Sequence, residues 1–188
     1  MLSVYTIGHS HLEMAQFVKL LEKHDISAIA DVRSHPYSRY VPHYNRENLT
    51  ESLKESGVHY VFLGKELGAR QEDDRLYDTG GKVNFDKVSQ TESFRSGLAR
   101  VIKGAQSHKI ALMCSEKNPL DCHRTHLVAR NLVEEGVAVS HIMEDGRLEN
   151  HADLIACHLG NQSDLFMSPE DAFYQKKGGD IAFKKDRA

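Results

Sequence analysis

A short apolar run that ends at a thiol constrains the fold of this chain more than any other feature. Residues 110–113 are Ile-Ala-Leu-Met and lead into Cys114. A polar loop follows, and Asp-Cys-His-Arg at 121–124 then opens an amphipathic run to Gly136. This pattern predicts a buried strand, a loop over its carboxyl end and a helix. The N-terminus of such a helix favours anions and lowers thiol pKa values.

The same alternation of strand-like and helix-like segments recurs along the chain. The β-prone runs are 4–7, 26–32, 59–63, 110–114 and 137–142, and the helix-like runs are 12–23, 45–56, 85–103 and 121–135. Ser10 and Asp121 are the expected caps of the first and last helix. The alternation predicts an α/β fold, a single compact domain with a mainly parallel sheet flanked by helices.

The domain is expected to cover residues 1–160, with 161–188 as an appended helix or a partly ordered tail. Residues 64–84 are polar and rich in glycine, and we expect a long mobile loop there that could close over a site.

Composition excludes several classes of protein. The net charge of −3 over 188 residues argues against a chain-wide basic surface for duplex DNA, although a local basic pocket is compatible with it. Three cysteines without an N-terminal signal segment predict a cytoplasmic protein rather than a disulfide framework. No apolar run approaches the roughly 18–20 residues that a spanning helix needs, so no membrane partner is expected.

Polar clusters follow four of the predicted strands. They are Gly8-His9-Ser10, Asp31–Arg33, Gly64–Arg70 and Cys114–Arg124. Ligands of parallel sheets bind at the carboxyl ends of the strands, so we expect these clusters to share one site.

Arg33, Arg70 and Arg124 are the strongest candidates for binding a ligand, because the arginine fork matches phosphate and carboxylate. The alternative is internal ion pairing with acids of the same clusters, namely Asp31, Glu66 and Glu116. Glu116, directly beyond Cys114, could act as an acid, a base or a nucleophile, and Asp31 is a second candidate.

The two cysteines at the ends of the loop allow two interpretations. Cys122, with His123 and Arg124 beside it, could be an activated nucleophile, and so could Cys114 at the strand end. Alternatively both are inert packing residues. The array of Cys114, Cys122, His123 and His126 matches no common zinc spacing, so neither a metal nor another cofactor is predicted.

Aromatic and basic residues alternate in the segment that follows Pro36. Tyr37, Arg39 and Tyr40 could stack on bases and contact the phosphates of a nucleotide or a single strand. The predicted substrate-binding residues are therefore His9, Ser10, Arg33, Tyr37, Arg39, Arg70, His123 and Arg124. The predicted catalytic residues are Glu116, Cys114, Cys122 and Asp31.

Several blocks in order resemble the DUF488 family, over roughly residues 4–151. They are Thr6-Ile7-Gly8-His9-Ser10, the run from Asp31 to Arg39, Glu66-Leu67-Gly68-Ala69-Arg70, the run from Leu112 to Pro119, Cys122-His123-Arg124, His141-Ile142 and Asp145-Gly146. Gly68-Ala69-Arg70 stands where members often have Gly-Gly-Arg. The resemblance implies a compact α/β domain and no settled reaction. The order of elements is also similar, more loosely, to a rhodanese-like domain, but nine residues separate Cys114 from Arg124 here.

Three functional hypotheses follow. The first is an enzyme acting on a phosphate-bearing small molecule or single-stranded nucleic acid, with arginines and a helix N-terminus holding the anion. The second is sulfur or phosphoryl transfer through the thiol of Cys114 or Cys122. The third is a metal-binding or ligand-sensing module without catalysis. The sequence leaves the oligomeric state open.

Overall fold

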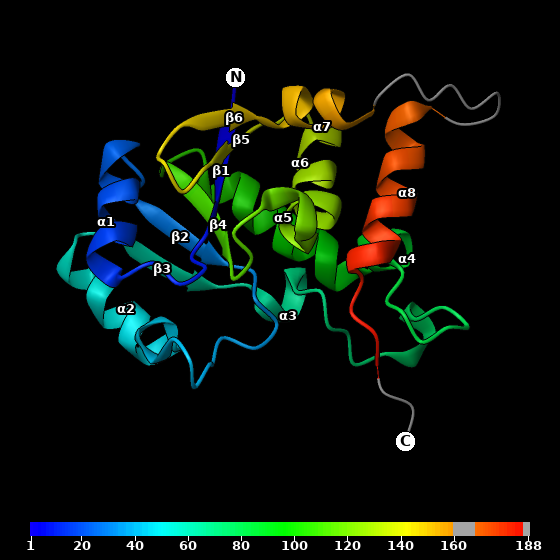
Figure 1. Cartoon of the computed structure of the whole chain (residues 1–188), viewed down its shortest axis with the longest axis horizontal. Helices are drawn as coiled ribbons and strands as arrows, with labels where there is room; N and C mark the ends of the chain where they lie inside the picture. Colours follow the sequence, from blue (N-terminus) through cyan, green and yellow to red (C-terminus); the bar gives the residue numbers. More distant parts are fainter. Residues whose placement is uncertain (160–167, 186–188) are drawn as a thin grey trace.

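The computed structural model describes residues 1–159 and 168–185 and confirms the α/β fold as one compact domain (Figure 1). Six strands form a single sheet in the order β3-β2-β4-β1-β5-β6. The first five strands pair in parallel, and β6 pairs antiparallel with β5. The strands are β1 (Ser3–Gly8), β2 (Ala28–Asp31), β3 (His59–Phe62), β4 (Ile110–Cys114), β5 (Ala138–Ile142) and β6 (Leu148–Asn150).

Helices lie between the strands in the chain, as the sequence predicts. The α-helices are α1 (Met14–Lys23), α2 (Arg46–Glu55), α3 (Gly64–Leu67), α4 (Phe85–Ser89), α5 (Glu92–Gly104), α6 (Arg130–Glu134), α7 (His151–Leu159) and α8 (Pro169–Ile181). Short 3₁₀ turns are η1 (Pro42–Tyr44), η2 (Asp74–Leu76) and η3 (Pro119–Asp121), and η4 (Arg124–Ala129) is a π-helical segment that runs into α6.

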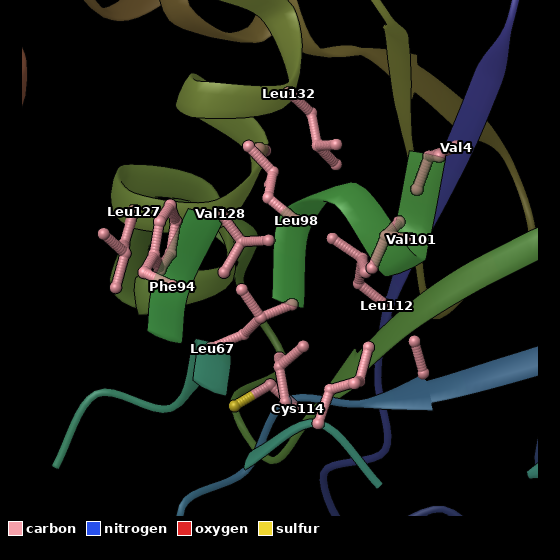
Figure 2. Packing of buried hydrophobic residues seen from close by; sticks show 14 of the residues in the cluster. Val4, Leu67, Phe94, Leu98, Val101, Leu112, Cys114, Leu127, Val128 and Leu132 are labelled. Atoms are coloured by element: carbon pink, nitrogen blue, oxygen red, sulfur yellow. The ribbon is translucent and has the colours of Figure 1, made fainter. Parts of the chain in front are cut away.

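The helices cover both faces of the sheet (Figure 1). On one face, Phe17 and Leu21 of α1 and Leu53 of α2 pack with Ala111 and Met113 of β4. On the other face, α5, η4 and α6 pack against the alternate strand residues. Figure 2 shows this second cluster, which includes Val4, Leu67, Phe94, Leu98, Val101, Leu112, Cys114, Leu127, Val128 and Leu132. Successive side chains of a strand point to opposite faces, so one strand contributes to both clusters.

Strand β4 explains why an uninterrupted apolar run was visible in the sequence. It lies between β2 and β1, and all five of its residues are buried. A strand covered on both faces reads as a continuous apolar run rather than an alternating one. Its last residue, Cys114, lies at the edge of the core cluster (Figure 2).

Two predicted helix boundaries are wrong. Ser10 has a φ of +48° and does not cap α1, because the chain makes a further turn first and Glu13 provides the capping box with Gln16. The predicted helix 85–103 is two helices, because the Thr91 hydroxyl accepts a hydrogen bond from the Phe94 N–H and starts α5 anew. Strand β6 was not predicted.

The prediction of a long mobile loop at 64–84 is also wrong in part. The segment contains α3 and η2. Its end pairs with the C-terminal residues, since the Val83 N–H donates to the Phe183 carbonyl and the Lys185 N–H donates to the Gly81 carbonyl, each at 2.9 Å. These backbone bonds fix the segment to the residues that follow α8.

The C-terminal part of the chain contains a helix, α8, that packs against η3, η4 and α7. The predicted boundary at residue 160 stays a prediction, and residues 160–167 and 186–188 of that part lie outside the described residues. Within residues 1–159 and 168–185, no helix combines the length and the apolar content needed to cross a membrane.

A chain of buried hydrogen bonds connects α8 to the sheet. The Thr6 hydroxyl lies 2.7 Å from Nδ1 of His141, Nε2 of His141 lies 3.0 Å from Nδ1 of His151, and Nε2 of His151 lies 2.8 Å from the Tyr174 hydroxyl. Burial, with a smaller contribution from the nearby His126, lowers the pKa of His151 to about 4. Burial and the neighbouring His151 hold the pKa of His141 well below its ordinary value. Both imidazoles are therefore neutral in the folded protein at pH 7.

The lowered pKa values of these histidines predict that the folded protein becomes less stable as the pH is lowered. Between pH 6.5 and 4 the unfolded chain binds protons that folded His151 does not, so the free energy of unfolding decreases as the pH drops. The loss from His151 reaches about 3 kcal/mol at pH 4. Urea titrations of the unmodified chain and of His151→Gln at pH 7 and pH 5 measure it. Between pH 7 and pH 5 the free energy of unfolding should decrease less in His151→Gln than in the unmodified chain. The exposed control His108→Gln should show the same decrease as the unmodified chain. An equal decrease in all three proteins would contradict the role of His151.

Candidate functional site

A pocket of about 220 Å³ lies where β2 and β4 end. Its walls come from four separate parts of the chain: Arg33, Ser34 and His35 after β2, Ala69 and Arg70 after α3, Cys114 to Glu116 with Asp121 to His123 around the loop after β4, and Ile181 and Phe183 at the end of α8. Larger cavities of about 620, 510 and 380 Å³ lie beside β3, beside α5 and beside α8, and among the described residues none of them is lined by a thiol. The smaller pocket gathers the reactive side chains.

Two thiols, an imidazole and a carboxylate meet on one wall of this pocket. Nδ1 of His123 lies 3.7 Å from Sγ of Cys114 and 3.8 Å from Sγ of Cys122. The Cys122 thiol donates to Oε2 of Glu116 at 3.0 Å. The ligand atoms of all four residues lie within 4.8 Å of one another, which is close enough for a single metal ion to bind them.

Cys122 holds its position because it caps the helix that follows. Its backbone is extended, its carbonyl accepts the Thr125 N–H at 3.0 Å, and its sulfur accepts the Arg124 N–H at 3.4 Å. These are the bonds of an N-cap residue. The prediction that Asp121 is the cap is wrong, since Asp121 ends η3 and pairs with Nζ of Lys177 at 2.8 Å.

His123 is oriented by the strand beside it. Its Nε2 lies 3.0 Å from the carbonyl oxygen of Val32, the residue after β2. A carbonyl oxygen only accepts, so Nε2 carries the proton and Nδ1 faces the two sulfurs. His126, one turn further on, lies 2.8 Å through Nε2 from the Leu120 carbonyl and is not among the clustered residues.

The site perturbs the pKa values of its acidic groups. Burial raises the pKa of the Cys114 thiol, and the neighbouring Cys122 raises it further. Burial also raises the pKa of the Cys122 thiol, but the hydrogen bond with Cys114 and the charges of Arg124 and His123 outweigh it and hold that pKa well below its ordinary value. Glu116 is exposed as a residue, yet its carboxyl is turned inward, and this burial raises its pKa.

Asp31, a predicted acid or base, is fully used in holding Arg33. Its Oδ1 accepts from the backbone N–H and from Nε of Arg33 at 3.0 and 2.9 Å, and its Oδ2 accepts from Nη2 of Arg33 and the Tyr60 hydroxyl at 2.7 and 2.8 Å. Asp31 has no exposed surface. Asp31 therefore holds Arg33 in position, and its predicted role as an acid or base stays a prediction.

Arg33 lines the pocket, but most of its guanidinium N–H groups are already bonded within the protein. Besides Asp31, its Nη2 bonds the Tyr44 carbonyl at 2.9 Å, and its Nη1 donates to Nε2 of His9 at 3.2 Å. Of the five guanidinium N–H groups, one on Nη1 has no such partner in the described part of the chain. Arg33 can thus give a ligand one N–H and its charge, not a bidentate fork.

Several predicted substrate-binding residues lie outside the pocket wall. His9 is buried against the ring of Tyr44, with 4.0 Å between the ring centroids, and supports Arg33. Ser10 occupies the turn after β1. Exposed Tyr37 donates to Glu47 at 2.8 Å, and Arg39 donates to the Tyr40 hydroxyl at 2.6 Å. None of these four predicted ligands lines the cavity.

Arg124 lies underneath the loop rather than beside a ligand. It is fully buried, and its Nη1 and Nη2 donate to the carbonyls of Glu116 and Lys117 at 2.6 and 3.2 Å. Gly8 lies against the same loop, and a Cβ at this position would come within 1.9 Å of the Glu116 carbonyl oxygen. Arg124 therefore holds the loop that contains Glu116, and its predicted binding of a substrate stays a prediction.

Arg70 is the predicted arginine that stands at the pocket with its guanidinium available. The guanidinium carbon lies 4.6 Å from the centre of the Phe183 ring, a cation–π contact. The backbone N–H of Arg70 donates to the Ser34 hydroxyl at 2.8 Å. Within the described residues, its guanidinium has no hydrogen bond or ion pair to a side chain or carbonyl.

A comparison with protein families matches residues 13–131, more than half of the chain, to the domain of unknown function DUF488. The chain belongs to the DUF488 family. No curated protein and no solved structure matches it. The looser likeness to rhodanese-like domains stays a prediction.

Sequence reasoning missed Ser34, His35, Ile181 and Phe183 of this DUF488 site. Ser34 and His35 follow directly after Arg33, so extending the strand-end cluster by two residues would have found them. Ile181 and Phe183 come from the end of α8, and no local pattern indicates that this end packs against Arg70.

Removing the support beneath the loop should destabilise the protein. Arg124→Ala leaves the carbonyls of Glu116 and Lys117 without their buried donors, and we expect the free energy of unfolding to fall by about 3 kcal/mol. Urea denaturation measures this change. The control Arg147→Ala removes a side chain that is 63% exposed and should change stability by less than about 0.5 kcal/mol. Equal effects of the two substitutions would show that Arg124 does not hold the loop.

Proposed function

We propose that this DUF488 protein is an enzyme that hydrolyses a small phosphate-bearing molecule, such as a nucleotide. One observation carries the proposal: Arg70, whose guanidinium has no hydrogen bond or ion pair among the described residues, and the carboxylate of Glu116 line the same pocket. Arginine binds phosphate in a bidentate way, and a nearby carboxylate can move a proton.

The size and charge of the pocket indicate which part of the substrate it holds. Its volume of about 220 Å³ is below the roughly 300–1,000 Å³ of pockets that enclose a whole ligand. It therefore accommodates one end of the substrate, the phosphate, and the remainder lies outside. Arg70 supplies the fork, and Arg33 supplies one further N–H and a positive charge.

The reaction is the addition of water to phosphorus. The water oxygen forms a bond to phosphorus and the ester P–O bond breaks. Glu116 accepts one proton of the water and passes it to the leaving oxygen, which returns Glu116 to its carboxylate form. Charge grows on the phosphoryl oxygens as the bond breaks, and Arg70 and Arg33 stabilise that charge. Arg124 binds the Glu116 carbonyl, and the missing Cβ of Gly8 leaves room for that carbonyl; together they keep the Glu116 carboxylate over the pocket.

Phosphate binding should raise the melting temperature through Arg70. At a ligand concentration one hundred times Kd, binding stabilises the folded state by about 2.7 kcal/mol, which for a chain of this length corresponds to a rise of roughly 5–10 °C. Thermal melts with inorganic phosphate, a panel of nucleotides and short oligonucleotides measure the shift. Arg70→Ala should abolish it, and Arg75→Ala, at a side chain that is 89% exposed, should retain it. The absence of any shift across the panel would refute the proposal.

Glu116→Gln should separate binding from turnover. The amide preserves the shape of the side chain but cannot accept the proton, so we expect hydrolysis to slow by about 10²–10⁴-fold while the thermal shift with phosphate persists. Colorimetric phosphate release from the substrate with the largest thermal shift measures the rate. Glu22→Gln, at an exposed position on α1, serves as the matched control and should keep full activity. An unchanged rate in Glu116→Gln would remove Glu116 from the reaction.

A further inference from the structure

We infer that Cys114, Cys122 and His123 bind one transition-metal ion, zinc by the chemistry of the ligands, with Glu116 beside an open coordination position. The binding of the ion stands on the geometry of these four side chains. Its use in hydrolysis rests on the proposed function, which it deepens by naming what activates the water.

The two sulfur–nitrogen distances at the site match those around a tetrahedral ion, and the two sulfurs lie within 4.8 Å of each other. With Zn–S near 2.3 Å and Zn–N near 2.0–2.1 Å, a sulfur and a nitrogen on the same ion lie roughly 3.6 Å apart. Nδ1 of His123 lies 3.7 and 3.8 Å from the sulfurs of Cys114 and Cys122. An ion can therefore enter between the three atoms with little movement of the protein.

Hydrogen bonds with neighbouring backbone groups orient His123 and Cys122, as is usual for the ligands of a metal ion. Nε2 of His123 is bound to the Val32 carbonyl, so Nδ1 faces the sulfurs and can bind a metal ion once any proton on it has left. The sulfur of Cys122 accepts the Arg124 N–H, which stabilises a thiolate. His9 and Gly8 are adjacent to the same strand end, since the His9 N–H donates to the Cys114 carbonyl at 2.9 Å. The ligand-bearing backbone is held from two sides.

The charge and softness of the ligands select the ion. Two thiolates and an imidazole form a set that zinc and similar soft or borderline ions prefer over magnesium or calcium. A divalent ion neutralises both thiolates, which are buried at 3% and 1% exposure. Binding forms two metal–sulfur bonds and one metal–nitrogen bond, and the protons held by the two sulfurs and by Nδ1 of His123 leave to solvent.

Three protein ligands leave a fourth position open, as in catalytic rather than structural zinc sites. All three ligands line the pocket that also contains Arg70. Oε2 of Glu116 lies 3.0 Å from the Cys122 sulfur, so its carboxylate stands next to the open position. A water in that position would lose its proton to Glu116 more readily, because a bound zinc ion lowers the pKa of water.

Elemental analysis of the chain purified without chelator tests the inference. We expect about one equivalent of zinc, and chelator-treated protein should take up one equivalent of Co²⁺ with thiolate-to-cobalt charge-transfer absorption. Cys114→Ser and Cys122→Ser should lose the ion, whereas Cys157→Ser, at an exposed cysteine on α7, should retain it. If the first two variants fail to fold, the cobalt spectrum of Cys157→Ser decides, because its thiolate bands can arise only from Cys114 and Cys122.

Less than about a tenth of an equivalent after incubation with Zn²⁺ or Co²⁺ would overturn the inference. Rapid alkylation of both buried thiols by iodoacetamide in zinc-loaded protein would do the same and would support thiol chemistry instead. Glu116→Gln should still bind a full equivalent of zinc. Loss of the ion in this variant would show that Glu116 is the fourth ligand and that no coordination position is open.

The failure of this inference is distinguishable from the failure of the proposed function. If the protein binds no metal but phosphate still raises its melting temperature through Arg70, the phosphate site is supported and the metal site is refuted. A full equivalent of zinc without any phosphate or nucleotide binding would confirm the ion and discard the phosphate substrate.

Discussion

The candidate site depends on how the loop after β4 is held. This loop leaves a buried central strand, and the carbonyls of Glu116 and Lys117 on its inner side need hydrogen-bond donors from the protein. The buried guanidinium of Arg124 binds these two carbonyls. Gly8 has no Cβ, so the loop can approach β1 closely at this point. Because both constraints act on Glu116, they set the position of its carboxylate relative to the two thiols.

The parallel sheet brings the remaining parts together. Val32, Cys114 and Gly8 follow or end three neighbouring strands, and the register pairs Gly8 with Cys114. The Val32 N–H also donates to the Met113 carbonyl at 3.1 Å, so β2 and β4 end at the same level. This is why the Val32 carbonyl can orient His123, and why Arg33 points into the same pocket. The site is thus built on strand ends rather than on mobile segments.

Burial assigns different tasks to residues of the same type. Arg33, Arg70 and Arg124 all follow strand ends in the sequence. Arg124 is enclosed and serves the loop, Arg33 is mostly bound to Asp31 and Tyr44, and Arg70 keeps its guanidinium at the pocket mouth. A charged group taken out of water needs partners inside the protein, so the degree of burial decides how much of each arginine remains for a ligand.

The sequence alone determined the alternation of strands and helices, the parallel sheet and the thiol at the end of β4, because hydrophobic periodicity and strand-end chemistry are local properties. It also placed Glu116 and Arg70 in the candidate site. Only the tertiary structure decided that Cys122 rather than Asp121 caps the helix, that Asp31 binds Arg33 and Arg124 binds the loop carbonyls, and that Phe183 contacts Arg70. Those assignments depend on hydrogen bonds and packing between residues distant in the chain, which no local pattern records.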